Sequence, residues 1–588
     1  MSVIAKNPIM PGFYPDPSIC AVGGDYYLVN STFAYFPGLP VMHSRDLCHW
    51  EQLGNALDRP SQLPLKGAGH SAGLFAPTIR YHNSTFYLIC TNVSGGGNFI
   101  VTASDPEGPW SEPYYIRGAE GIDPSLFFDE DGKCYYIGTH PNPEGCKYNG
   151  DWYIWIQELD LSRMELTGQA MDVWNGAMRN VIWPEGPHLY KKDGYYYILH
   201  AEGGTGPDHA VTVCRSRNIW GPYENNPCNP ILTHRHLGKD YPVRYVGHGD
   251  IIETPRGEWY MVMLAVRPRK GCTIMGRETF LARVVWENGW PVVNPGAGML
   301  TDQVKIDLPE WDPWQEETSF TSRSGFRNCC PGSSREYDFA REGRERLGDE
   351  FLFLRNPEKD MYRLAQGEGL WLKFGAVSLK ETESPSFAGI RQQHHSFAAK
   401  ASVDMGSFPQ EDDGFKAGLV FMQSNEYHLR MELSRSKAEM ILCEKGRDQV
   451  LGSALIHPDK AADHVCEDAA GEIREGDTET EVRGAEYREA ALLLQVRGLT
   501  ASLSVQGAGG QILACGSVDI SSLSTETAGG FVGCTVGLYA VDEREGCGRG
   551  QVLFGDSMGN CVRNAEVCFR YFSYEAMEES DEEQQAFV

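Results

Sequence analysis

Three carboxylic acids and one histidine stand at matching places of a short phrase that the sequence repeats. Asp16 opens one copy, Asp123 opens another, Glu185 directly precedes a third, and His248 directly precedes a fourth. Two carboxylic acids that face each other can hydrolyse a glycosidic bond. A protonated acid gives its proton to the leaving oxygen, and an ionised acid activates water or attacks the anomeric carbon. A third acid can tune and orient the proton donor, because neighbouring carboxyls shift one another's pKa.

The repeated phrase predicts how the chain brings these residues together. Each copy is followed by a polar turn and an aromatic pair, which is the pattern of two paired strands. The five copies are residues 16–19, 76–79, 123–126, 186–189 and 249–252, and their starts lie 47 to 63 residues apart. Such a repeat predicts five blades of a β-propeller. The first strand of each blade lines the central axis, so the acids and the histidine are expected to converge on one site.

A purely structural role is the alternative interpretation of the acids. Asp-Pro is a common turn opener, so one such motif alone is more often structural than functional. Positions needed only for turns should resemble one another across the repeats, yet Ala76 and Gly249 stand in this frame in the second and fifth copies. The acids are therefore interpreted as functional, although composition and spacing assign no roles among them.

The length of 588 residues predicts two or more domains in an all-β chain. Residues 1–305 consist of short β-type runs between turns and form the expected propeller. Residues 306–335 are rich in Pro, Ser and Arg and predict a linker or strap. Alternating strands resume over 336–575 and predict an antiparallel β-sandwich, with an exposed loop at 458–486. Residues 576–588 are an acidic tail that is expected to be disordered.

The charge balance restricts the classes of partner. The net charge is −28, from 80 acidic and 52 basic residues, and the sequence contains no cluster of Lys and Arg. This argues against nucleic acid or an anionic membrane as partner. A neutral polysaccharide meets no such objection. The beginning of the chain has no apolar signal region, and the sequence contains no apolar run long enough to span a membrane, so a cytoplasmic protein is expected. The oligomeric state stays open, a homo-oligomer included.

Ordered motifs along the chain resemble those of a known family. They are residues 7–8, 12–19, 31–33, 35–38, 121–125, 185–190 and 276–280, followed by 384–387, 391–393 and 531–533. Together they resemble glycoside hydrolase family 43, in its two-domain β-xylosidase and α-L-arabinofuranosidase type. The resemblance runs through the propeller region and into the second domain, which it implies to be a concanavalin-like jelly roll.

The resemblance implies an inverting mechanism with a single displacement. Asp16 matches the general base that activates water, Glu185 matches the general acid, and Asp123 matches the residue that raises the pKa of the acid and orients it. Arg277 matches an arginine that hydrogen-bonds the sugar and keeps the base ionised. The residues themselves agree with this last role, since a guanidinium beside Asp16 favours its charged form. Without the resemblance, Arg277 would be interpreted as a surface ion pair.

The resemblance also implies roles for other residues. His248 matches a histidine that in many relatives coordinates a central calcium or a water bound to it. Calcium prefers oxygen ligands, so a metal at His248 would be held mainly through water, and a hydrogen-bonded core histidine is the alternative. Phe33 and Phe75 are candidates for the wall of a substrate pocket, with packing between blades as the alternative. Many relatives carry Trp at the position of Phe75. Phe531 resembles a residue of the second domain that closes the pocket, or else packs in a core.

The expected function is that of an exo-acting glycosidase that releases terminal β-D-xylose, α-L-arabinofuranose or both from xylo-oligosaccharides or arabinoxylan, without an organic cofactor. An endo-arabinanase-like enzyme with an open groove is the nearest alternative. A retaining fructosidase is disfavoured because its Asn-Asp-Pro-Asn-like and Arg-Asp-Pro motifs are absent. A non-catalytic carbohydrate-binding propeller gives no reason for acids at the starts of the repeats.

Overall fold

The regular secondary structure of the described residues is almost entirely β-strand. The computed structural model describes residues 2–313, 330–341, 343, 345–409, 413–456, 489–507, 510–544 and 565–578. Within them, two compact units are distinguished, one built on Met1–Gly332 and the other spanning Ser333–Gln584. None of the helices in these ranges has the length and apolar character needed to cross a bilayer. The predicted loop at 458–486 and nearly all of the predicted tail lie outside the described residues.

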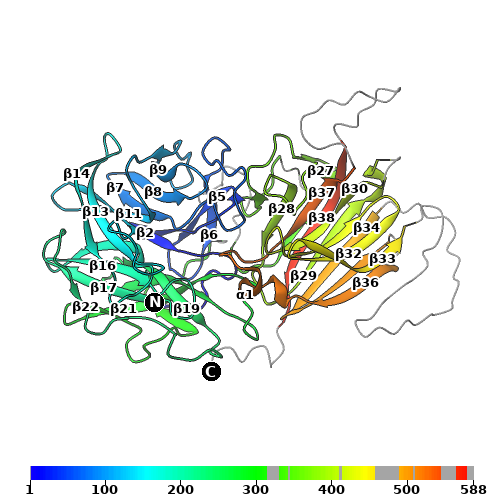
Figure 1. Ribbon diagram of the computed structural model, residues 1–588. Coiled ribbons are helices and arrows are strands. Elements are labelled where there is room, and N and C mark those ends of the chain that lie inside the picture. The colour runs from blue at the N-terminus through cyan, green and yellow to red at the C-terminus, as the bar shows by residue number, and fades with distance from the viewer. Residues whose placement is uncertain are drawn as a thin grey trace. The chain divides into compact units, whose positions relative to one another are not determined.

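The described part of the first unit contains five four-stranded antiparallel sheets (Figure 1). Sheet 1 holds β2 (Ser18–Val22), β3 (Asp25–Val29), β5 (Gly38–Ser44) and β6 (Glu51–Leu57), with the short β4 (Tyr35–Phe36) between β3 and β5 in the chain. Sheet 2 holds β7 (Thr78–His82), β8 (Thr85–Asn92), β9 (Gly97–Ala103) and β10 (Tyr114–Tyr115). Sheet 3 holds β11 (Ile122–Phe128), β12 (Cys134–Pro141), β13 (Trp152–Asp160) and β14 (Glu165–Trp174).

The remaining two sheets of this unit follow in chain order. Sheet 4 holds β15 (Glu185–Lys192), β16 (Tyr195–Glu202), β17 (Ala210–Ser216) and β18 (Glu224–Asn225). Sheet 5 holds β19 (Arg244–Glu253), β20 (Trp259–Val266), β21 (Glu278–Glu287) and β22 (Trp290–Val293). Each copy of the predicted phrase lies at the first strand of one sheet. These first strands contact one another in a closed series, β2 with β7, β7 with β11, β11 with β15, β15 with β19, and β19 with β2.

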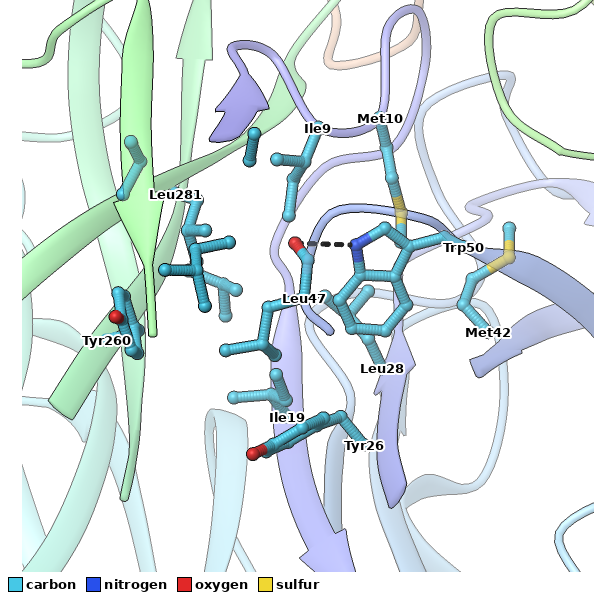
Figure 2. Close-up of a cluster of buried hydrophobic side chains, with 14 of the residues drawn as sticks. Ile9, Met10, Ile19, Tyr26, Leu28, Met42, Leu47, Trp50, Tyr260 and Leu281 are labelled. Carbon is cyan, nitrogen blue, oxygen red and sulfur yellow. Dashed lines mark hydrogen bonds between the residues drawn. The ribbon is translucent and has the colours of Figure 1, made fainter. Parts of the chain in front are cut away.

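A buried apolar cluster joins the last sheet to the first (Figure 2). Ile19, Tyr26 and Leu28 of sheet 1 pack in one cluster with Tyr260 and Leu281 of sheet 5. The same cluster takes in residues of β1 (Val3–Lys6), which pairs antiparallel with β23 (Gln303–Ile306). The two ends of the first unit therefore meet where the series of sheets closes, and apolar burial stabilises that closure.

Asn7 ties the start of the chain to sheet 5 and to the approach to β23. Its Nδ2 donates to the carbonyl oxygens of Leu281 at 2.8 Å and Thr301 at 2.9 Å, and its Oδ1 accepts from the Leu281 N–H at 2.8 Å. The residue is only 2% exposed, so water cannot replace these bonds. The asparagine of the 7–8 motif thus has a structural role in the closure of the first unit.

Replacing Asn7 with Ala is expected to destabilise the first unit by at least about 2 kcal/mol, because a buried donor and buried acceptors lose their partner. Scanning calorimetry should show a lower unfolding temperature than for the wild type. Asn149→Ala is the matched control, since Asn149 is exposed in a turn. Equal unfolding temperatures for the two variants would contradict the role of Asn7.

The described part of the second unit contains two antiparallel sheets. The larger runs in the order β26 (Tyr362–Ala365), β27 (Gly369–Lys373), β38 (Glu566–Ala576), β29 (Ser396–Asp404), β34 (Glu489–Arg497), β35 (Thr500–Gln506) and β36 (Ile512–Asp519), with β24 (Arg335–Asp338) also pairing with β38. The smaller runs in the order β28 (Ser386–Arg391), β37 (Thr535–Asp542), β30 (Phe415–Met422), β31 (His428–Leu433), β32 (Lys437–Glu444) and β33 (Arg447–Leu455).

The sequence pattern of the second unit explains these two sheets. Burial alternates along β34, as expected of a strand with one face in a core. Strands of the two sheets contact each other, for example β33 with β36 and β29 with β30. The remaining elements are short: β25 (Phe353–Leu354), two 3₁₀ turns at Met405–Ser407 and Ser521–Leu523, and α1 (Thr525–Ala528). This unit is a β-sandwich, as predicted from the alternating runs.

Candidate active site

Four of the first strands share an unusual backbone feature beside the predicted site residues. Asp16, Asp123, Gly186 and His248 have φ angles of 52°, 54°, 56° and 51°. Left-handed backbone is uncommon outside glycine, although Asp and His tolerate it better than most residues. Such conformations gather at functional sites, where the surrounding structure holds them in place. The repeat therefore specifies a local turn as well as a residue type.

This geometry corrects the frame of the fifth repeat by one residue. The sequence pattern aligns Gly249 with Asp16, but the left-handed position is occupied by His248. The strand pairing supports the corrected frame: Gly247 and Asp250 pair with Leu264 and Val262, in the same pattern as Ile122 and Ser125 with Thr139 and Ile137 in sheet 3. In the corrected frame, Asp250 stands two residues after the left-handed position, as Ser18 does in the first repeat.

Asp16 is buried and held by two donor groups. Its Oδ1 accepts from Arg277 Nη1 at 2.6 Å, and its Oδ2 accepts from Ser31 Oγ at 2.5 Å and from Arg277 Nη2 at 3.3 Å. Burial alone would raise the pKa of Asp16, but Arg277, His248 and Ser31 outweigh burial and hold that pKa below its usual range. Asp16 is thus an ionised carboxylate, as a general base or nucleophile must be.

The pKa values of Asp123 and Glu185 are shifted in the opposite direction, upward. Burial, with the repulsion of Asp16, raises the pKa of Asp123 to about 6, although His248 opposes this shift. Burial also raises the pKa of Glu185 well above its usual value, and the charges of Asp123 and Asp16 add to the rise. Asp123 Oδ2 accepts from the N–H of Gly186 at 3.2 Å, which links it to the residue after Glu185. Glu185 is therefore suited to carry a proton near neutral pH.

Two histidines complete the surroundings of these acids. His248 Nδ1 lies 4.0 Å from Asp16 Oδ1, and its ring packs so closely on Gly186 that a Cβ there would lie 2.7 Å from His248 Cε1. His209 Nε2 lies 3.8 Å from Glu185 Oε1, while His209 Nδ1 pairs with the carbonyl oxygen of Tyr245 at 2.9 Å. Burial lowers the pKa of His209 to about 4, so a neutral ring with a bare Nε2 faces the acid.

Sequence reasoning missed His209 and Ser31 of this arrangement, and also Arg80, whose guanidinium pairs with Asp250 of β19 at 2.8 Å. No repeat frame marks His209, which lies at the end of a loop before β17. Ser31 belongs to the family-like motif at 31–33, but nothing in that motif assigns it a role. Arg80 directly follows the second copy of the phrase, so its position in that copy was the one available signal.

The aromatic candidates have different surroundings. Phe33 is 2% exposed, and the Arg277 guanidinium carbon lies 5.5 Å from the centre of its ring. The rings of Phe33 and Phe75 are 5.5 Å apart and tilted by 58°. Phe33 thus supports the arginine that holds Asp16, and Phe75 adjoins Phe33. Phe531 belongs to the second unit, where it is 40% exposed; its closure of a pocket stays a prediction.

The charge of Asp123 should determine the pH at which kcat/KM falls on the alkaline side. The activity should rise with pH as Asp16 loses its proton and fall as Glu185 loses its own. Asp123→Asn removes a negative charge that raises the pKa of Glu185, while the amide oxygen can still accept from Gly186. The alkaline limb of kcat/KM is therefore expected to move to lower pH. A limb that stays in place, or moves to higher pH, would contradict this coupling.

The fold and the site together define a class of protein. An ionised carboxylate and a protonated carboxyl, brought together from different β-sheets, are the equipment of an acid–base glycosidase. Residues 5–291 match the family model of glycosyl hydrolases family 43, and residues 336–554 match that of the β-xylosidase C-terminal concanavalin A-like domain.

Similar proteins cover nearly the whole chain. A xylosidase/arabinosidase from Butyrivibrio fibrisolvens is 49% identical over 541 residues, which cover 92% of this chain and 96% of the relative. A non-reducing end α-L-arabinofuranosidase of Bacteroides ovatus is 35% identical over 545 residues and 91% of each chain. A solved xylan β-1,4-xylosidase from Bacillus halodurans has a TM-score of 0.79 at 31% identity, with 97% of this chain and 100% of that chain covered. The chain therefore belongs to glycosyl hydrolase family 43, a family of glycosidases, as its motifs predicted.

Proposed function

We propose that this chain is an exo-acting, inverting glycosidase that releases terminal β-D-xylose, α-L-arabinofuranose or both from xylo-oligosaccharides and arabinoxylan fragments. The opposite pKa shifts of Asp16 and Glu185 within one site carry the proposal. The substrate class is supported by relatives whose names combine the two activities, and the exo action by the relative that acts at the non-reducing end.

In the proposed reaction each carboxyl performs one proton transfer. Asp16 takes a proton from a water molecule as the water oxygen forms a bond to the anomeric carbon. The bond from that carbon to the glycosidic oxygen breaks, and Glu185 gives its proton to this oxygen. Asp123 keeps Glu185 protonated until then, and Arg277 keeps Asp16 ionised. One displacement inverts the configuration of the anomeric carbon.

The five sheets of the first unit are proposed to be five blades of a propeller with this site on its axis. The closed series of contacts among the first strands supports the proposal. Left-handed residues at the same place of four of these strands support it as well. A propeller brings residues that are distant in the sequence to one axis, which explains why the acids come from different repeats.

Hydrolysis of paired substrates tests the proposal. The purified protein is incubated with 4-nitrophenyl β-D-xylopyranoside, 4-nitrophenyl α-L-arabinofuranoside and xylotetraose, and products are followed by chromatography and proton NMR. We expect cleavage of at least one aryl glycoside, xylose as the first product from xylotetraose, and an inverted anomer at early times. Cleavage of none of them would overturn the assigned substrate class. Internal products or a retained anomer would overturn the exo action or the inversion, respectively.

A further inference from the structure

Asp250 is a buried carboxylate with every acceptor position occupied. Arg80 Nη1 donates to its Oδ2 at 2.8 Å and Arg80 Nη2 to its Oδ1 at 3.2 Å. Ser18 Oγ and the Ile19 N–H also donate to Oδ2, at 2.7 and 3.1 Å, and the Tyr190 hydroxyl donates to Oδ1. A carboxylate offers about four lone-pair positions, so these five donors saturate Asp250.

The same guanidinium reaches further around the first strands. Arg80 Nη2 lies 3.0 Å from His188 Nδ1, and Ser125 Oγ lies 3.2 Å from the same nitrogen. Burial lowers the pKa of His188 to about 3, with Arg80 opposing the effect of Asp250; His188 is therefore neutral and its Nδ1 accepts. Each of the five sheets thus contributes at least one side chain to a single polar layer, through Ser18, Arg80, Ser125, His188 and Asp250.

This layer is next to the active-site residues along the chain. In the corrected frame, four residues of the layer stand two positions after the left-handed residue of their repeat: Ser18 after Asp16, Ser125 after Asp123, His188 after Gly186 and Asp250 after His248. Arg80 comes from the second sheet, whose repeat carries Ala76 in place of an acid. One positive side chain therefore cross-links β7, β15 and β19, the last two of which carry Glu185 and His248.

The surroundings of His248 do not fit the calcium that the family resemblance implied. Calcium takes six to eight oxygen ligands, commonly carboxylates. Asp16 is held by Arg277 and Ser31, and Asp250 is saturated. Among the described residues, the one group of three or more His, Cys, Asp or Glu side chains close enough to share an ion is His428, Cys443 and Asp448 of the second unit. In addition, a divalent cation near Asp250 would meet the charge of Arg80.

We propose that the Arg80 guanidinium is the resident cation of this layer, in the role that a bound divalent ion would otherwise have, and that the protein neither binds nor needs calcium there. Arg80 neutralises Asp250 and holds the strands that carry Glu185 and His248. It is a positioning residue, since it acts on the acids through these strands. The inference goes beyond the proposed glycosidase function and uses that function only for one readout.

The first test is made on the wild-type protein and does not depend on its substrate. The protein is dialysed against EDTA, exposed to 1 mM calcium chloride and desalted, and its metal content is measured by mass spectrometry. We expect calcium far below one ion per chain and the same unfolding temperature with EDTA or with calcium, because a ligand that does not bind cannot stabilise. One retained calcium per chain, with a lower unfolding temperature in EDTA, would overturn the proposal. A metal-free protein that cleaves no sugar would overturn the proposed function and leave this inference standing.

The second test removes the resident charge. Arg80→Met keeps an unbranched side chain without charge, and Arg256→Met is the matched control because Arg256 is 44% exposed in its ion pair with Asp307. We expect Arg80→Met to lose about 10- to 100-fold in kcat through misplaced site residues and to unfold at a lower temperature. Added guanidinium or calcium ions at millimolar concentration should raise the unfolding temperature of Arg80→Met alone. An Arg80→Met variant that is as stable and as fast as the wild type would overturn the role of Arg80. If this variant does not fold, the metal content of the wild-type protein still decides whether calcium is bound.

Discussion

Glu185→Gln should lower kcat/KM for xylobiose, or for the matching arabinosyl substrate, by at least about 10²-fold, the usual contribution of a general acid. The loss should be much smaller for an aryl glycoside with a good leaving group. The reason is that a sugar alkoxide needs a proton as it departs, whereas a nitrophenolate leaves without one. Gln keeps the size of Glu185, so the substitution removes the proton and little else. Rates with the two substrates give the measurement.

A control and a contradicting outcome complete this experiment. Glu144→Gln makes the same chemical change at an exposed position and should leave both rates unchanged. Equal losses of Glu185→Gln on the sugar and aryl substrates would mean that Glu185 does not protonate the leaving group. Because His209 Nε2 lies 3.8 Å from Glu185 Oε1, the unfolding temperature of the variant should also be compared with that of the wild type.

The sequence predicted those site residues that have a distinctive residue type at a distinctive place in the repeat. Asp16 and Asp123 are acids at a place of the repeat where the second and fourth copies carry Ala76 and Gly186, and this contrast separates function from turn formation. Glu185 directly precedes the fourth copy. Arg277 was found only through the family resemblance, because an arginine between Gly276 and Glu278 has no distinctive spacing. The structure shows why it belongs there: its guanidinium reaches Asp16 across 261 positions of sequence.

The features that escaped sequence reasoning depend on backbone register and on contacts between sheets. The backbone conformation places His248, and not Gly249, in the frame of the fifth repeat, and no residue pattern in the sequence marks this. His209 and Arg80 have meaning only through Glu185 and Asp250, which lie on other strands. The strands themselves were easier to predict, since alternating burial and aromatic pairs are local signals. Local patterns thus predicted the elements, and tertiary contacts decided which polar residues serve the site.

The largest loss is expected for Asp16→Asn, about 10³-fold or more in kcat/KM, toward the upper part of the range for proton-transfer catalysis. Asn is the appropriate replacement because the φ of Asp16 is 52°, a conformation that Asn tolerates and Ala does not. The amide oxygen can still accept from Arg277 or Ser31, so the loss reflects the missing charge. Water must be activated whatever group departs, so the sugar and aryl substrates should lose equally.

This equal loss is the opposite of the pattern expected for Glu185→Gln, and the pair of variants therefore separates the base from the acid. Asp193→Asn is the matched control: Asp193 has a φ of 51° and an exposed side chain, so it tests the same substitution on the same backbone without the site. Unfolding temperatures must accompany the rates, because Arg277 loses a buried partner in Asp16→Asn. A loss that is large for sugars and small for aryl glycosides would assign Asp16 to the leaving group and reverse the proposed roles. A loss below about tenfold would place the base on another residue.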